Sequence, residues 1–265
     1  FRLYSLQKVY VGEDEEPLQE YEKIKSLKFD GAAISLLYVD GPLVLALTRG
    51  DGIEGQDITD KMLASDLVAH ELDWRGIVQI GGEIVAPKSI ENARNYAAGA
   101  LNLKDINEFL KRDITFIAYS VNHESYLDSN YEDDMCGLAD AGFTVAHEVY
   151  LGQDIYPTDG EVYRINNNAD YEAQGYTSKH PKGAYAVKIR GEAVETEILS
   201  VDWQVGKSGK VTPVANLRPV MIGDAEVSRA TLNNQAFIEA LGICIGDTVG
   251  VIRAGEIIPQ ILYKV

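Results

Sequence analysis

The C-terminal part of the chain carries the pattern that most restricts the fold. Five short β patterns follow one another closely, at residues 194–205, 210–219, 225–228, 247–253 and 257–263. One helical pattern, at residues 232–241, interrupts them and ends at Gly242. A string of short strands with a single helix is typical of a small barrel. We therefore predict an all-β barrel domain over residues 191–265.

The longer N-terminal part mixes strand and helix patterns. Strands are predicted from apolar or alternating runs at residues 27–38, 43–48, 77–85, 113–121, 161–164 and 184–189. Helices are predicted at residues 13–25, 57–72, 87–99 and 131–141, and a polar loop at 166–181. After about Arg190 the mixed helix and strand patterns give way to closely spaced short β patterns, so we predict a first domain over residues 1–190.

The charge distribution restricts the partners. A formal net charge of −17 argues against a protein that coats nucleic acid non-specifically. Residues 1–164 hold 14 basic and 30 acidic side chains, whereas residues 165–265 hold 10 and 11. A polyanionic partner is therefore expected at the C-terminal part, or at a local patch. The basic side chains available there include Lys207, Lys210, Arg218, Arg229 and Arg253.

Composition also restricts the cellular setting and the metal chemistry. No apolar run approaches the ~20 residues that a membrane-spanning helix needs, so no membrane partner is expected. Cys136 and Cys244 are the two cysteines of the chain, which excludes a disulfide framework and a four-cysteine zinc site. We therefore expect a cytoplasmic protein without zinc.

Several familiar catalytic motifs are absent from the sequence. It contains no phosphate-binding Gly-x-x-x-x-Gly-Lys-Ser/Thr loop, no Gly-x-Gly-x-x-Gly and no His-Glu-x-x-His. The four histidines lie far apart along the chain, so a hydrolase built on a histidine base is disfavoured.

Charged residues instead gather at the ends of predicted strands. They are Lys28, Asp30, Arg49, Glu83, Asp159, Arg164 and Lys188. Four cations suit a phosphate-rich ligand, and carboxylates beside them suit a ribose or a metal. A lysine among other cations has its ammonium form disfavoured, and its free amine can attack phosphorus to give a phosphoramidate. Taken singly, each of these residues is more readily explained as a solvated surface charge.

Several short motifs occur in a fixed order. In the first domain they are Lys28-Phe29-Asp30-Gly31, Thr48 to Gly52, Gly81-Gly82-Glu83-Ile84, Asn92 to Leu101 and Asp159 to Arg164. In the barrel they are Gln204-Val205-Gly206, Thr212 to Ala215, Val227 to Leu232 and Ala254 to Pro259. In this order and spacing, the chain resembles the NAD-dependent DNA ligases of bacteria over essentially its whole length.

The resemblance implies a fold and a reaction. The fold is α+β: an adenylation (nucleotidyltransferase) domain of antiparallel sheets with flanking helices, followed by an oligonucleotide/oligosaccharide-binding (OB) barrel. Lys28, in a catalytic motif with Asp30, would attack the α-phosphorus of NAD, release nicotinamide mononucleotide and carry AMP. The AMP would pass to the 5′-phosphate of nicked double-stranded DNA, and the 3′-hydroxyl would then displace it, as DNA replication and repair require. NAD and Mg²⁺ are the implied cofactors.

The resemblance also assigns the nucleotide pocket. It places Ser5 and Leu6 against the adenosine, Glu83 at the ribose, Arg49 at the nucleotide and Lys188 at the α-phosphate, with Asp159 and Arg164 lining the same pocket and Asp159 as the candidate metal ligand.

The sequence departs from the family pattern in ways that leave alternatives open. Ser26 replaces a glutamate that reads adenine, Arg164 replaces a lysine, and Asn102 replaces an arginine. Residues 1–265 do not include the family's N-terminal module that grips the nicotinamide half, nor its zinc-finger, helix-hairpin-helix and BRCT modules. We therefore expect a minimal or split ligase, whose nicotinamide module lies in a second chain or in residues upstream of Phe1. The alternatives are a nucleotidyltransferase of the same fold that uses ATP or a non-DNA acceptor, and a non-catalytic nucleotide-binding subunit.

Overall fold

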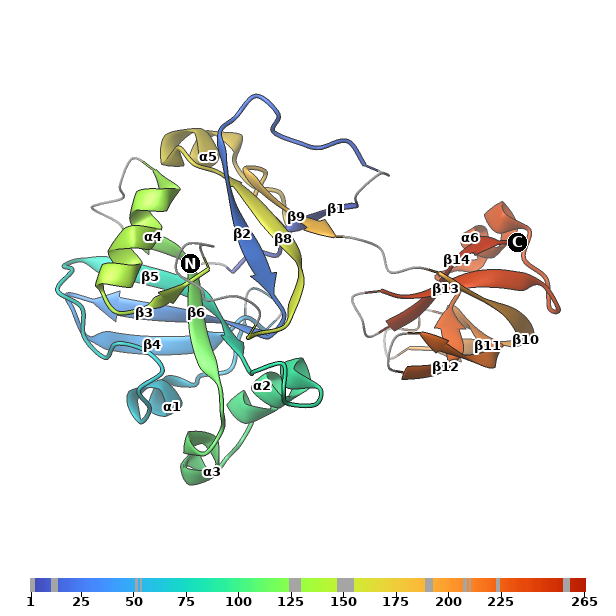
Figure 1. The fold of residues 1–265 in the computed structure, drawn as a ribbon, viewed down its shortest axis with the longest axis horizontal. Coiled ribbons are helices and arrows are strands. Elements are labelled where there is room, and N and C mark those ends of the chain that lie inside the picture. The colour runs from blue at the N-terminus through green and yellow to red at the C-terminus, as the bar shows by residue number, and fades with distance from the viewer. Residues whose placement is uncertain are drawn as a thin grey trace. The chain divides into compact units, whose positions relative to one another are not determined.

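The structure is a computed structural model, and it places two units of the chain. It describes residues 3–10, 14–50, 52, 54–123, 130–146, 155–188, 193–206, 209, 211–222, 225–254 and 258–265. The units are Phe1–Lys188 and Ile189–Val265 (Figure 1). Each is built around its own cluster of buried apolar side chains.

A five-stranded sheet forms the centre of the first unit, with the strand order β4-β3-β5-β6-β7. Its strands are β3 (Ala32–Val39), β4 (Leu43–Thr48), β5 (Ile77–Val85), β6 (Thr115–His123) and β7 (Thr144–Val145). All neighbours pair antiparallel except β6 and β7, which pair parallel. Alternate residues of β3, namely Ile34, Leu36 and Tyr38, are fully buried, as expected for a strand with one face on the core.

Short helices pack against this sheet. They are α1 (Thr59–Leu63), α2 (Ala93–Leu101), α3 (Ile106–Leu110) and α4 (Tyr131–Asp140). Helix α1 contacts β4, α2 contacts β3 and β5, and α4 contacts β6 and β7. Met62, Ala97 and Leu138 bring these helices into the buried cluster of the sheet. Within the parts of the chain that the structure describes, no helix has the length and apolar character needed to cross a bilayer.

A second, four-stranded sheet gathers segments that are distant in the sequence. Its strands are β1 (Gln7–Tyr10), β2 (Lys23–Phe29), β8 (Thr158–Ile165) and β9 (Ala184–Lys188), in the order β1-β9-β8-β2. β2, β8 and β9 pair antiparallel, and β1 adds parallel to β9. Helix α5 (Asn168–Gln174) contacts β8. This sheet therefore brings together the C-terminal ends of β2 and β9 and the N-terminal end of β8.

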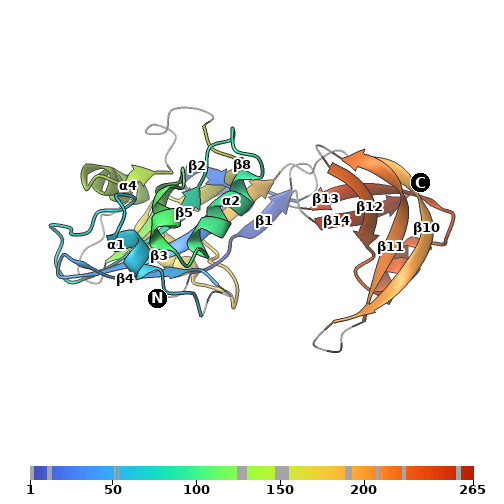
Figure 2. The ribbon, with the colours of Figure 1, turned by 90° about the horizontal axis from the view of Figure 1, so that it is seen from below.

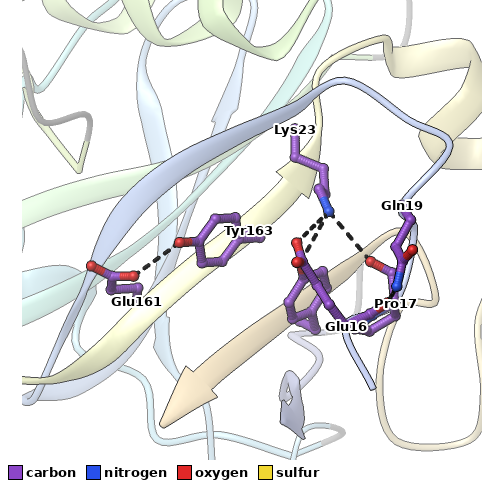
Figure 3. Close-up of polar contacts among 7 residues, drawn as sticks. Glu16, Pro17, Gln19, Lys23, Glu161 and Tyr163 are labelled. Atoms are coloured by element: carbon purple, nitrogen blue, oxygen red, sulfur yellow. Dashed lines mark hydrogen bonds and ion pairs between the residues drawn. The ribbon is translucent and has the colours of Figure 1, made fainter. Parts of the chain in front are cut away.

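The helix predicted at residues 13–25 is wrong. Residues 14–22 contain no helix, and Lys23–Phe29 is strand β2. Strand β2 pairs with β8 instead, where Ile24 lies opposite Arg164. Figure 3 shows the chain that leads into β2, where Lys23 Nζ donates to Glu16 Oε1 at 2.6 Å and to the Pro17 carbonyl at 3.4 Å. Acidic residues come first and lysines last in residues 13–25, an order that also suits a helix dipole, so charge order alone does not reveal the extended chain.

Three further predictions need correction. The helix predicted at 57–72 is limited to the five residues of α1, in which Met62 is buried and Leu63 is exposed. Pro87 precedes α2, which begins at Ala93. The predicted loop at 166–181 contains α5, where the Asn167 side chain accepts a hydrogen bond from the Asp170 N–H at 2.9 Å. A polar N-cap thus starts a helix that has few aliphatic residues.

The second unit is the predicted barrel. Its strands are β10 (Val194–Val205), β11 (Val211–Ile222), β12 (Ala225–Thr231), β13 (Thr248–Ala254) and β14 (Ile258–Lys264), and its helix is α6 (Gln235–Leu241). The barrel closes in the order β10-β11-β12-β14-β13, and β13 pairs with β10. The long strands β10 and β11 curve around it (Figure 2). The predicted α+β fold with a following barrel is confirmed.

Candidate active site

Three of the predicted site residues meet in one cluster. Asp159 Oδ1 accepts a hydrogen bond from Lys28 Nζ at 2.7 Å, and Asp159 Oδ2 accepts one from Lys188 Nζ at 2.5 Å. Lys28 lies near the end of β2, Asp159 near the start of β8 and Lys188 at the end of β9. Because these strands are neighbours in one sheet, their ends place the three charges side by side.

The cluster is partly buried and carries a net positive charge. The side chains of Asp159 and Lys188 are 9% and 11% exposed, and that of Lys28 is 27% exposed. Burial alone would raise the pKa of Asp159, but hydrogen bonds from Lys188 and Lys28 outweigh it and lower that pKa. One carboxylate between two ammonium groups leaves one positive charge, which suits a phosphate group as ligand.

Gly160 allows β8 and β9 to approach each other beside this cluster. Its φ is +147°, and a Cβ atom there would lie 2.2 Å from the Val187 carbonyl oxygen. Real Cβ atoms do not come so close, so one of the two strands would have to move. Gly160 is therefore part of what holds Asp159 and Lys188 in contact.

Replacement of Gly160 by alanine should lower the free energy of unfolding by about 3 kcal/mol, because strain at positive φ adds to a backbone clash. Gly142 is the matched control: its φ is +91°, but a Cβ atom there would meet nothing within 4 Å. Gly142→Ala should cost only about 1–2 kcal/mol. Urea unfolding of both variants measures the difference, and equal losses would contradict the close approach.

Asp30 lies at the junction of β2 and β3 and pairs with an arginine. Its Oδ1 accepts a hydrogen bond from Arg94 Nη1 at 2.8 Å, and its N–H donates to the Pro157 carbonyl at 2.8 Å. Burial raises the pKa of Asp30, and the charge of Arg94 opposes that shift. Arg94 comes from the first turn of α2. Asp30 therefore ties the strand that carries Lys28 to this helix, a pairing that the sequence did not predict.

Glu83 faces the same region from the central strand β5. The Gly31 N–H donates a hydrogen bond to its carboxylate, and Lys28 and Arg49 are close enough to act on its charge. Burial raises the pKa of Glu83 to about 7, although the two cations and the Gly31 hydrogen bond oppose the shift. Gly31 itself permits this contact, since a Cβ atom there would lie 2.1 Å from the Ile84 carbonyl oxygen.

The raised pKa of Glu83 predicts a pH-dependent stability. Its ordinary value is 4.5, so the stabilisation is fully present below pH 4.5 and is lost as the pH rises through about 7. Wild type should therefore lose about 3 kcal/mol relative to Glu83→Gln between pH 4.5 and pH 7.5. Urea unfolding at both pH values measures this change. Glu91→Gln, at an exposed glutamate, should show no such trend, and a flat difference for Glu83→Gln would refute the assignment.

Tyr119 is a member of the site that the sequence did not predict. It lies on β6, and burial raises the pKa of its hydroxyl; the charge of Glu83 raises it further, and Arg49 opposes the shift. These influences place the ring near both residues. Arg49 is exposed, and its N–H donates to the Ala33 carbonyl at 2.9 Å. An aromatic ring beside a carboxylate and an arginine suits a nucleoside.

The N-terminal segment approaches β5. Ser5 is exposed, Leu6 is partly buried, and the Ser5 N–H donates to the Lys179 carbonyl at 3.1 Å. The Tyr4 ring stacks on the Tyr176 ring at 4.9 Å between centroids. A Cβ atom at Gly81 would lie 3.4 Å from Leu3 Cδ2. The segment that carries Ser5 and Leu6 therefore passes two residues away from Glu83 along β5.

Arg164 is not brought into the lysine cluster. Its guanidinium carbon lies 4.3 Å from the Tyr131 ring centroid and 3.9 Å from the Tyr171 ring centroid. Nη2 donates to Asn168 Oδ1 at 2.8 Å, and Nη1 donates to the Ile165 carbonyl at 3.0 Å. Arg164 is therefore held by α4 and α5.

The site residues do not form a metal centre in this arrangement. Among the described residues, no group of three or more His, Cys, Asp or Glu side chains is placed to hold a metal ion. Both carboxylate oxygens of Asp159 are engaged by ammonium groups. Mg²⁺ needs free oxygen ligands, so the predicted metal role of Asp159 does not fit this geometry.

A hollow of about 650 Å³ lies elsewhere on the first unit. It is lined by Glu71, Leu72, Asp73, Trp74, Arg75, Val121, His123, Asp134, Gly137, Asp140 and Ala141. Carboxylates outnumber the single arginine, whose Nη1 donates to the Asp40 carbonyl. No lysine lines it. An acidic hollow that no lysine lines does not suit a phosphate-rich ligand, which favours the lysine cluster as the active site.

The two sheets, the lysine cluster and the separate barrel define the class of ligase-type nucleotidyltransferases. A solved structure named Pmar-Lig_Pre shares the fold, with a TM-score of 0.54 and 9% identity over 98% of this chain and 66% of that chain. Residues 2–157 match the model of the NAD-dependent DNA ligase adenylation domain, and residues 195–265 match that of the NAD-dependent DNA ligase OB-fold domain. The chain belongs to the NAD-dependent DNA ligase family.

Curated relatives of the chain are also DNA ligases. A DNA ligase of Flavobacterium psychrophilum is 36% identical over 99% of this chain and 46% of its own length. A DNA ligase of Cellvibrio japonicus is 37% identical over 90% of this chain and 41% of its own length. The chain spans about half the length of the curated relatives it matches.

Proposed function

We propose that this chain performs the AMP-transfer chemistry of an NAD-dependent DNA ligase. Residues 1–190 would act as the adenylation domain and residues 191–265 as the OB-fold domain. The observation that carries the proposal is the contact of Lys28 and Lys188 with the two oxygens of Asp159. The family of the chain supplies the reaction that such a cluster would serve.

In the first step, the Lys28 amine attacks the α-phosphorus of NAD. A phosphorus–nitrogen bond forms, the bond between the two phosphates breaks, and nicotinamide mononucleotide leaves with the electron pair. The Lys28 ammonium must lose a proton first, and the Asp159 carboxylate lies 2.7 Å from Nζ. Lys188 offers its positive charge to the α-phosphate as charge develops on it.

In the later steps, AMP moves from Lys28 to DNA. A 5′-phosphate oxygen at a nick attacks the AMP phosphorus, and the phosphorus–nitrogen bond breaks. The 3′-hydroxyl then attacks the 5′-phosphate, forms the phosphodiester and releases AMP. The DNA partner would be nicked double-stranded DNA, used in replication and repair. Mg²⁺ is general to such ligases, and no step proposed for this chain depends on it.

The other predicted residues would hold the nucleotide. Glu83 would bind the ribose, Arg49 the nucleotide, and Ser5 and Leu6 the adenosine. Asp30 accepts a hydrogen bond from Arg94 Nη1 at 2.8 Å, and through this contact it would fix the end of the strand that carries Lys28. We place the protein in the cytoplasm. The comparisons give no support to a second chain that supplies a nicotinamide-binding module.

The donor is tested by comparing adenine-labelled NAD with adenine-labelled ATP. Wild type should form a covalent adduct with NAD and none with ATP. Labelling by ATP and not by NAD would show that ATP is the donor. Ser26, which is 5% exposed and stands where the family has a glutamate, would then be the residue to test for the change of donor. Nucleotide binding with no adduct from either donor would overturn the enzymatic proposal in favour of a binding subunit.

A further inference from the structure

The Arg164 side chain is held by residues of the two helices α4 and α5. Its guanidinium carbon lies 4.3 Å from the ring centroid of Tyr131 in α4 and 3.9 Å from that of Tyr171 in α5. Asn168 Oδ1 accepts from Nη2, and Asn168 Nδ2 in turn donates to Asp134 Oδ2 at 2.7 Å. A planar cation held against two rings with a fixed acceptor has little freedom to follow a ligand.

Tyr131 links this arrangement to strand β6. Its side chain is buried, with 5% of the residue exposed, and its hydroxyl donates to the Tyr119 carbonyl at 2.8 Å. The orientation of the Tyr131 ring decides where that hydroxyl points. Because Arg164 lies on the ring, Arg164 restricts the orientation.

Tyr119 is the extra residue of a β-bulge. In the pairing of β5 with β6, Gly81 lies opposite Ser120 and Gly82 lies opposite Ala118, so Tyr119 has no partner residue on β5. A bulge redirects the side chain of its extra residue. A Cβ atom at Gly81 would lie 3.5 Å from Tyr119 Cε2. The bulge therefore places the Tyr119 ring beside Gly81, two residues before Glu83.

We propose that Arg164 and Tyr131 are positioning residues for the nucleotide site. Arg164 orients the Tyr131 ring, the Tyr131 hydroxyl fixes the bulge at Tyr119, and the Tyr119 ring is thereby held beside Glu83. This inference rests on the proposed function, because it assumes that the site binds a nucleotide. It differs from the role implied by the family resemblance, in which residue 164 contacts the nucleotide itself.

A double-mutant cycle on the full chain tests the proposal. The variants are Tyr131→Phe, which removes only the hydroxyl, Arg164→Lys, which keeps the charge, and the two combined. Each single variant should weaken AMP binding about 10-fold, and the double variant should be no weaker than the weaker single one. Hydrogen exchange of the free protein should be faster at residues 118–120 in each variant and unchanged in β3 and β4.

The control is Tyr163→Phe, which removes a tyrosine hydroxyl from β8 that donates to Glu161 at 3.0 Å. It should leave AMP binding unchanged. Additive losses in the cycle, or unchanged exchange at residues 118–120, would overturn the proposal and favour direct contact by Arg164. If wild type binds AMP but forms no adduct, the proposed function fails and the cycle still decides the positioning role. If wild type binds no AMP, both fail.

Discussion

Lys28→Arg is expected to abolish covalent labelling of the protein by adenine-labelled NAD, with a loss of at least about 10³-fold. A guanidinium stays charged at every working pH and is a poor nucleophile. Arginine keeps a positive charge at this position, where Lys28 Nζ pairs with Asp159 Oδ1 at 2.7 Å. The fold should therefore persist while the phosphorus–nitrogen bond cannot form, and labelled protein on a denaturing gel measures the result.

Lys25→Arg is the matched control for this variant. Lys25 lies on the same strand, β2, and its Nζ pairs with Glu161 at 2.7 Å, away from the cluster. Its labelling should equal that of wild type, and the unfolding midpoints of both variants should stay close to that of wild type. Normal labelling of Lys28→Arg would show that another residue carries the nucleotide.

Asp159→Asn should have the second largest effect on labelling, because it leaves two neighbouring ammonium groups without their counter-ion. The Lys188 side chain is 11% exposed, and a mostly buried charge that loses its partner costs about 3 kcal/mol. The exposure of Lys28 reduces the loss on its side of the pair. We expect about 2–3 kcal/mol lower stability at pH 7, and labelling by NAD reduced about 100-fold because Lys28 is no longer positioned.

The stability loss of Asp159→Asn should depend on pH in a defined direction. The pKa of Asp159 is lowered from its ordinary value of 3.8. Its stabilising effect is therefore present above pH 3.8 and is lost as the pH falls through the folded value. The difference between wild type and variant should shrink below about pH 4. Asp66→Asn, at an exposed aspartate, should show neither the stability loss nor the labelling loss.

Local periodicity predicts those elements whose stability is local. Strand β5 has the predicted bounds, Ile77–Val85, because the apolar residues of this run form the centre of the sheet. Helix α4 ends one residue before the predicted end, where Gly142 adopts a φ of +91°. The five barrel strands follow from short β patterns at close spacing.

Elements held by distant partners could not be predicted in this way. Strand β2 is fixed by β8, more than 130 residues away, where Ile24 lies opposite Arg164. Helix α5 packs through Tyr171 on Arg164 rather than through an aliphatic stripe. Neither contact leaves a pattern in the local sequence.

The same division applies to the site. Lys28, Asp159 and Lys188 stand at strand ends, so the sequence could place them in one candidate site. Arg94 was visible within a motif, but its pairing with Asp30 depends on how α2 packs on the sheet. Tyr119 escaped prediction because its orientation depends on a bulge. That bulge lies opposite the step from Gly81 to Gly82, and a Cβ atom at Gly82 would come within 2.3 Å of the Phe116 ring.

The central claim is that Lys28 carries AMP as a covalent intermediate. Its most direct test is to incubate the wild-type chain with NAD, digest it, and locate the added AMP by tandem mass spectrometry. We predict a single acid-labile AMP on the peptide that contains Lys28, and its loss when nicotinamide mononucleotide is added back. AMP attached to any other residue, or a protein that stays unmodified at saturating NAD, would contradict the account.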